Sequence, residues 1–178
     1  MELEKKFQVG DHAPYIQAAA AHGFERVSEK HQIDTYFILN QRREDGTRHY
    51  LRIREDGIKR RLSLDYHRVL SELETDEIEQ PIQDEAAFRR ILGFLGYAPL
   101  CTVDKRRVVH RRGPVEVTFD QVAGLGSFIE VEIEGSGDEP TIAILEQAVA
   151  DLGLQGAPAI TLKGYPDLLL EQRRDART

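Results

Sequence analysis

The strongest constraint in this sequence is a two-residue alternation of polar and apolar side chains that recurs along the chain. In residues 2–9 (ELEKKFQV), the glutamates, Lys6 and Gln8 alternate with Leu3, Phe7 and Val9. Successive side chains of a β-strand point to opposite faces, so such a run places its charges on one face. The same pattern recurs at Arg52/Arg54, Glu77/Glu79, Lys105/Arg107, Glu116/Thr118/Asp120 and Glu130/Glu132.

Turn and capping residues divide the chain into short elements. Pro14, Asp84 and Pro140 are typical helix starts, and Asp56-Gly57 is a strong hairpin signal. The expected strands are residues 2–9, 24–29, 32–39, 49–55, 58–66, 75–82, 102–111, 115–122 and 128–134, and the expected helices are 15–22, 85–95, 140–152 and 166–171. Roughly eight strands joined mostly as hairpins predict an antiparallel α+β domain.

The charged faces decide how these strands associate. If the helices pack on the apolar faces, the charged faces must line a common interior. An eight-stranded, closed antiparallel β-barrel with a polar lumen and helices packed outside meets this condition and leaves no free sheet edge. A sheet with one solvated, charged face is the alternative that the residues leave open.

Length and composition narrow the class of protein. The 178 residues fit one domain, which we expect to span residues 1–172, with 173–178 as a frayed, charged tail. A net charge of −7 argues against a nucleic-acid partner. A single cysteine, Cys101, excludes an intrachain disulfide and a cysteine-based zinc site and indicates a reducing, cytoplasmic compartment. No apolar run or signal peptide predicts membrane association, and nothing decides between a monomer and a homodimer.

The chemistry available to the chain is that of carboxylates with Arg and Lys. The sequence contains no phosphate-binding loop motif, no dinucleotide fingerprint and no pair of histidines at metal-ligand spacing. Arg presents a fork of donors that matches phosphate oxygens, and carboxylates attract hard cations such as Mg²⁺. A polyanion bound together with its metal ions would satisfy both groups in one lumen.

The N-terminal segment Glu2-Leu3-Glu4-Lys5-Lys6 resembles the Glu-x-Glu-x-Lys opening of the CYTH superfamily, the triphosphate tunnel metalloenzymes. Further similar motifs are Leu51–Arg54, Glu77–Glu79, Val103–Arg107, Phe119–Asp120 with Gly124–Glu132, and Tyr165–Leu169. The stretch from Asp120 to Glu132 is most similar to the branch that contains class IV adenylyl cyclases. The resemblance implies an eight-stranded barrel whose tunnel binds a triphosphate with a divalent metal.

The resemblance also implies roles for individual residues. Those that would hold phosphate oxygens and support catalysis are Lys6, Arg52, Arg54, Lys105 and Arg107. Those that would ligate Mg²⁺ or Mn²⁺ are Glu2, Glu4, Glu130 and Glu132, with Asp120 close by as a catalytic or metal-binding group. Glu77 and Glu79 would orient the basic residues or contribute to a second metal site.

One position departs from the family pattern. The strand after the hairpin usually carries a Lys, and Asp65 stands there in the segment Leu62-Ser63-Leu64-Asp65-Tyr66-His67. We expect Arg61, on the same face of the strand, to compensate part of this charge change as an additional phosphate contact. Tyr36 is expected either to face the lumen near an organic moiety or to lie in the core.

Three functions are consistent with these residues. The first is a class IV adenylyl cyclase-like enzyme that converts ATP to cyclic AMP and pyrophosphate. The second is a triphosphatase that acts on inorganic tripolyphosphate or thiamine triphosphate. The third is a protein that binds polyphosphate or nucleotide without turnover, as Asp65 allows.

Overall fold

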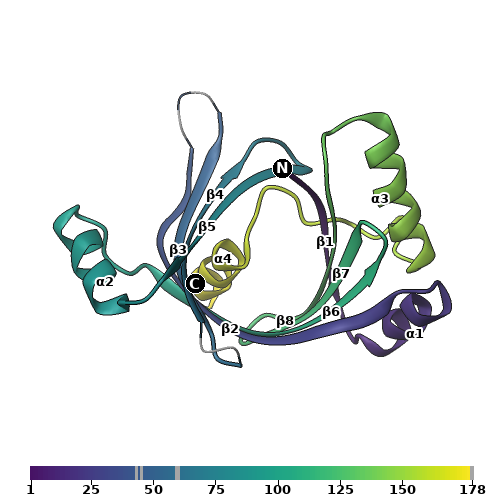
Figure 1. Ribbon diagram of the computed structural model, residues 1–178, viewed down its shortest axis with the longest axis horizontal. Helices are drawn as coiled ribbons and strands as arrows, with labels where there is room; N and C mark the ends of the chain where they lie inside the picture. Colours follow the sequence, from purple (N-terminus) through teal and green to yellow (C-terminus); the bar gives the residue numbers. More distant parts are fainter. Residues whose placement is uncertain (43, 45, 59–60, 177–178) are drawn as a thin grey trace.

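Eight antiparallel strands close into a barrel in the computed structural model, which describes residues 1–42, 44, 46–58 and 61–176 (Figure 1). The strands are β1 (Glu2–Val9), β2 (Glu25–Arg42), β3 (Arg48–Asp56), β4 (Arg61–Val69), β5 (Glu74–Ile82), β6 (Cys101–Arg112), β7 (Val115–Val122) and β8 (Gly126–Glu134). Their order around the barrel is β1-β5-β4-β3-β2-β6-β7-β8. The predicted closed barrel is confirmed, and an open sheet with one solvated face is excluded.

β2 is the main difference from the expected strands. The runs 24–29 and 32–39 form a single strand, because the residues between them continue the ladder with β6 instead of turning. The first part of β2 pairs with β6 and its end pairs with β3, with bulges on both sides. β4 begins at Arg61 rather than residue 58, and residues 59–60 of the expected strand lie outside the described part of the chain.

Three helices cover the apolar outer faces of the barrel, as expected. α1 (Ala13–Ala21) and α3 (Glu139–Asp151) pack on a cluster that includes Leu3, Phe119 and Ile129, all at most 2% exposed. α2 (Glu85–Phe94) starts at the Asp84 cap and packs through Leu92 on the opposite side of the barrel (Figure 1). No helix among the described residues has the length and apolarity to cross a bilayer.

The last helix, α4 (Tyr165–Asp175), is placed differently from the prediction that helices pack outside. It lies within the outline of the barrel (Figure 1), where Tyr165 and Leu169 pack on Tyr36, Val103 and other inward-facing side chains. The inward positions are apolar in this part of the barrel, so burying them requires an apolar element inside the barrel wall. The helix includes residues 173–175, which the sequence assigned to the tail; 177–178 lie outside the described residues.

This packing predicts that α4 contributes substantially to stability. Leu169 is 6% exposed, and we expect Leu169→Ala to lower the free energy of unfolding by about 2–4 kcal/mol through lost burial and the cavity that remains. Leu95→Ala is the matched control, because Leu95 is 66% exposed and its truncation should change stability by less than about 0.5 kcal/mol. Urea denaturation measures the free energy of unfolding of both variants. Equal losses of stability in the two variants would show that the packing of α4 in the barrel contributes little to stability.

Candidate functional site

A polar cavity inside the barrel brings together ten of the residues selected from the sequence. They are Glu2, Glu4, Lys6, Arg52, Arg54, Glu77, Lys105, Arg107, Glu130 and Glu132. Tyr36 also lines the cavity and belongs to the buried cluster under α4, so it faces the lumen and packs in the core at once. The sequence analysis did not select Tyr50, His67, Tyr165 or the segment 160–164 as lining residues. Tyr50 could have been found, because it shares the inward face of Arg52 and Arg54 on β3.

Three selected residues do not line the cavity. Arg61 is exposed at the start of β4, and Glu79 is exposed on β5. Asp120 is fully buried and lies behind the cavity wall, where it contacts Arg107 and Tyr165. The structure therefore assigns Asp120 to holding a cation in place.

Arg107 is the best-anchored cation of the site. Its Nε and NH2 donate to the two carboxylate oxygens of Asp120 at 2.7 and 2.6 Å, and its NH2 also donates to Glu130. The Tyr165 hydroxyl donates to Asp120 Oδ2 at 2.8 Å, so α4 supports the same carboxylate. This bidentate pair fixes the plane of the guanidinium before any ligand binds.

Arg52 and Arg54 are held by a buried carboxylate that the sequence analysis missed. Asp34 on β2 accepts from Arg54 Nε and NH2 at 2.7 and 2.9 Å and lies 3.5 Å from Arg52 NH1. Burial disfavours its charged form, but Arg54 and Arg52 hold the pKa of Asp34 well below its ordinary value. The one signal in the sequence was its position two residues before Tyr36, on the inward face of β2.

Asp65 belongs to the same network, which corrects the expected role of Arg61. Asp65 is fully buried and accepts from Arg52 Nε at 2.9 Å, with Arg54 NH1 at 3.7 Å. The compensating cations are therefore these two arginines, which face Asp65 directly, and not the exposed Arg61. A carboxylate at this position therefore orients the two inward-facing arginines.

The acidic wall is built from the neighbouring strands β1 and β8. Glu4 pairs with Glu132 in the ladder and Lys6 with Glu130, so their side chains share the inward face. Lys6 Nζ lies 3.0 Å from Glu4 and 3.1 Å from Glu130, and these two carboxylates raise the pKa of Lys6 against the effect of burial.

The other glutamates of this wall lack a matching cation. Neither Glu2 nor Glu132 forms an ion pair with any residue that the structure describes. Burial, together with neighbouring carboxylates, raises the pKa of Glu2 to about 7 and that of Glu132 to about 8. Burial and Glu130 also raise the pKa of Glu4. Such under-neutralised carboxylate oxygens are suitable donors for a hard divalent cation, so Glu2, Glu4 and Glu132 fit Mg²⁺ or Mn²⁺.

Lys105 is the least neutralised cation of the opposite wall. Burial and the nearby Arg107 lower the pKa of Lys105 to about 7. Its Nζ lies 3.9 Å from Asp34 Oδ2 and 5.2 Å from the centre of the Tyr165 ring. An anion that enters the cavity would favour the charged ammonium, so Lys105 can respond to a bound phosphate by taking up a proton.

Comparison with known proteins agrees with this geometry. Residues 1–161 match the CYTH domain, and the chain belongs to this family. A protein of Methanocaldococcus jannaschii, named a "Putative adenylate cyclase", is 28% identical over 148 residues, which are 83% of this chain and 85% of that protein.

Solved structures share the fold at low sequence identity. The PH1012 protein of Pyrococcus horikoshii has a TM-score of 0.84 at 24% identity, covering 95% of this chain and 99% of that one. A Vibrio parahaemolyticus protein described as a "putative adenylate cyclase" has a TM-score of 0.74 at 22% identity, covering 95% and 97%. A Hippeastrum protein, described as a "Putative adenylyl cyclase" with a dominant triphosphatase activity, has a TM-score of 0.64 at 18% identity, covering 97% and 96%.

The raised pKa of Glu132 predicts a pH-dependent effect of Glu132→Gln. The folded protein keeps this proton up to a pH of about 8, against an ordinary pKa of 4.5, so it binds more protons than the unfolded chain between these values. This carboxyl therefore makes the wild-type protein lose stability as pH rises through that window, by at most about 1.4 kcal/mol per pH unit. In EDTA, the Tm of Glu132→Gln relative to wild type should increase from about pH 5 to about pH 8.

Glu134→Gln is the control for this measurement, because it makes the same change at an exposed position on β8. It should not reproduce the increase. A Tm difference between Glu132→Gln and wild type that is independent of pH would show that Glu132 is not held protonated in the metal-free cavity.

Proposed function

We propose that this CYTH protein is a metal-dependent enzyme that binds a triphosphate in the barrel cavity, with adenylyl cyclase activity as the leading reaction. One observation carries the proposal: a wall of anchored cations and a wall of under-neutralised glutamates line one cavity. A metal–triphosphate complex supplies the negative charge that the first wall accepts and the positive charge that the second requires.

Different side chains of the cavity would bind different parts of the metal–triphosphate complex. Three guanidinium groups would bind phosphate oxygens, those of Arg52, Arg54 and Arg107. Buried aspartates already fix their orientation, so these side chains would lose little conformational freedom when the substrate binds. Lys6 and Lys105 would add point charges on either side.

Glu2, Glu4 and Glu132 would hold the divalent cation, with Glu130 bridging Lys6 and Arg107. When bound, the metal neutralises phosphate oxygens and makes a hydroxyl or water a better nucleophile. The protein residues then hold the chain of phosphates in line with that nucleophile and stabilise the charge on the departing group.

The cyclase reaction is supported by the segment from Asp120 to Glu132 and by the name of the Methanocaldococcus jannaschii relative. Such an enzyme must direct the ribose 3′-hydroxyl at the α-phosphorus, with loss of pyrophosphate. Both walls face the same cavity, so one triphosphate could contact the cations of one wall and the metal ion held by the other.

A triphosphatase is the second candidate, and the tyrosines of the cavity favour it. Two of their hydroxyls are engaged as donors, that of Tyr50 to Asp167 and that of Tyr165 to Asp120, and that of Tyr36 accepts from Arg52. The cavity thus offers many groups for phosphate oxygens and few for the edge of a base. The Hippeastrum protein, with the same fold, is described as having a dominant triphosphatase activity.

Product analysis separates these reactions. The protein is incubated with ATP, tripolyphosphate or thiamine triphosphate, each with Mg²⁺ or Mn²⁺ or with EDTA. We expect metal-dependent formation of cyclic AMP and pyrophosphate from ATP, whereas release of orthophosphate would identify the triphosphatase. Binding of the triphosphates without turnover would contradict the proposal of an enzyme and favour a protein that only binds them.

A pair of arginine variants on β6 tests the site itself. Arg107→Ala should lower kcat/KM by about 100-fold or more, because it removes a charge-assisted contact to the phosphates. Arg106→Ala is the matched control, since the neighbouring Arg106 is exposed on the outer face of the same strand and should retain activity. Arg107→Lys preserves the charge facing buried Asp120, and circular dichroism verifies that each variant folds. Full turnover in Arg107→Ala would refute the assignment.

A further inference from the structure

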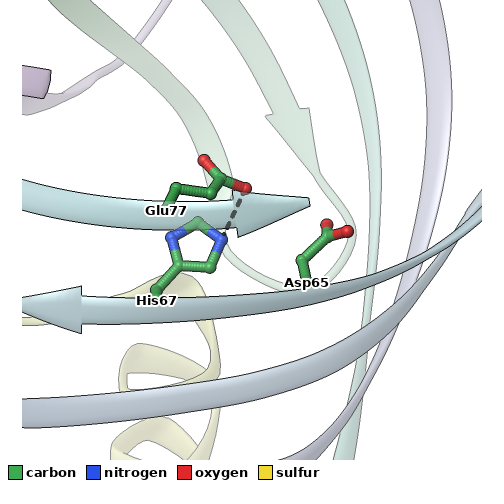
Figure 2. Close-up of side chains that lie close together, drawn as sticks. All are labelled: Asp65, His67 and Glu77. Atoms are coloured by element: carbon green, nitrogen blue, oxygen red, sulfur yellow. Dashed lines mark ion pairs between the residues drawn. The ribbon is translucent and has the colours of Figure 1, made fainter. Parts of the chain in front are cut away.

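Asp65, His67 and Glu77 form a compact cluster on the inward face of β4 and β5, here named the β4–β5 triad (Figure 2). Asp65 and His67 are two residues apart on β4, and Glu77 lies directly opposite His67 in the ladder with β5. One ligand atom from each residue lies within 4.8 Å of the other two. All three side chains project to the same side of the two strands (Figure 2).

One ligand atom of the triad, Asp65 Oδ1, is buried without a hydrogen-bond partner among the described residues. Asp65 is 0% exposed, and its Oδ1 accepts no hydrogen bond, although its Oδ2 accepts from Arg52. His67 Nε2 forms an ion pair with Glu77 Oε1 at 2.8 Å, so these two groups already lie at a distance that one shared cation could bridge. Buried polar atoms are nearly always satisfied, so the unpartnered Asp65 Oδ1 beside this pair indicates a place for a further ligand.

Arg52 holds the carboxylates of the triad from one side. Its Nε donates to Asp65 Oδ2 at 2.9 Å and its NH2 to Glu77 Oε1 at 3.1 Å. Each carboxylate accepts up to about four contacts, so both keep lone pairs for a further partner. The guanidinium therefore orients the two acids without saturating them, as outer partners of metal ligands do.

We propose that the β4–β5 triad is a binding site for one transition-metal dication of the Zn²⁺ type. One imidazole nitrogen with two carboxylate oxygens is a donor set that suits such a metal better than Mg²⁺, which prefers oxygen ligands alone. Ligand atoms of a tetrahedral zinc ion are about 3.3 Å apart, so no separation in the triad would need to contract by more than about 1.5 Å.

This site differs from the glutamate wall on β1 and β8 in its donor atoms. That wall has only oxygen donors and fits Mg²⁺ or Mn²⁺, whereas the triad adds the imidazole of His67. His67 and Glu77 also line the cavity, so a fourth coordination position would face the space in which we propose that the triphosphate binds. The metal site itself does not depend on that proposed function, because it is defined without substrate.

Zn²⁺ titration by calorimetry tests the proposal directly. The full-length protein is stripped with chelator, and Zn²⁺ is added in excess Mg²⁺, which occupies the oxygen-only wall, with no nucleotide present. We expect one Zn²⁺ per chain for wild type and at least a 100-fold weaker affinity for His67→Gln. Substitution with Co²⁺ should give the visible absorption of a nitrogen-ligated ion in wild type and lose it in the variant.

Two control variants identify the site. His31→Gln removes an exposed imidazole that also contacts a carboxylate, Asp104 at 2.8 Å, and should leave Zn²⁺ binding unchanged. Glu4→Gln alters the glutamate wall and should also retain the ion. Loss of binding in either control but not in His67→Gln, or no stoichiometric binding in wild type, would overturn the proposal. Asp65→Asn, once its folding is verified, provides a second test and should also weaken Zn²⁺ binding. The expected Zn²⁺ result is the same whether or not the protein turns over triphosphates.

Discussion

The neutralisation of cations inside the barrel is the constraint on which the rest of this structure depends. An arginine taken out of water is strongly destabilising unless a carboxylate faces it with good geometry. Arg107 meets this condition through Asp120, and Arg52 and Arg54 meet it through Asp34 and Asp65. Each pair joins two neighbouring strands of the barrel wall, so the ion pairs connect β2 to β3, β3 to β4 and β6 to β7. The network offsets the desolvation cost that unpaired arginines would impose on a closed barrel with a charged interior.

The same network makes the interior asymmetric. The arginines have carboxylates behind them, whereas Glu2 and Glu132 have no ion-pair partner in the part of the chain that the structure describes, and their pKa values are raised. Positive groups are therefore held in fixed orientations on one wall, while on the other wall Lys6 neutralises Glu4 and Glu130 only. A ligand that combines an anion with a cation would neutralise groups on both walls, which links the electrostatics of the cavity to the function proposed for the protein.

Much of this arrangement could be predicted from the sequence, for a physical reason. A period of two fixes the face of each side chain relative to its own strand, so the alternation in residues 2–9 identified the inward-facing glutamates and Lys6 directly. Asp34 was missed because it lies in a strand whose two faces are less distinct in sequence. Arg61 and Glu79 were placed on the correct face, but each lies where the strand is exposed. Alternation gives a residue's face and not its depth in the barrel.

The sequence by itself determined most of the strands, most of the inward-facing charges and, through the CYTH motifs, the family. Only the tertiary structure decided which charges face one another. The pairing of Asp65 with Arg52, the position of α4 inside the barrel and the meeting of His67 with Glu77 all depend on strand register and barrel closure. These bring together side chains that are distant along the chain, and the local rules of backbone geometry that shape a single strand do not specify such contacts.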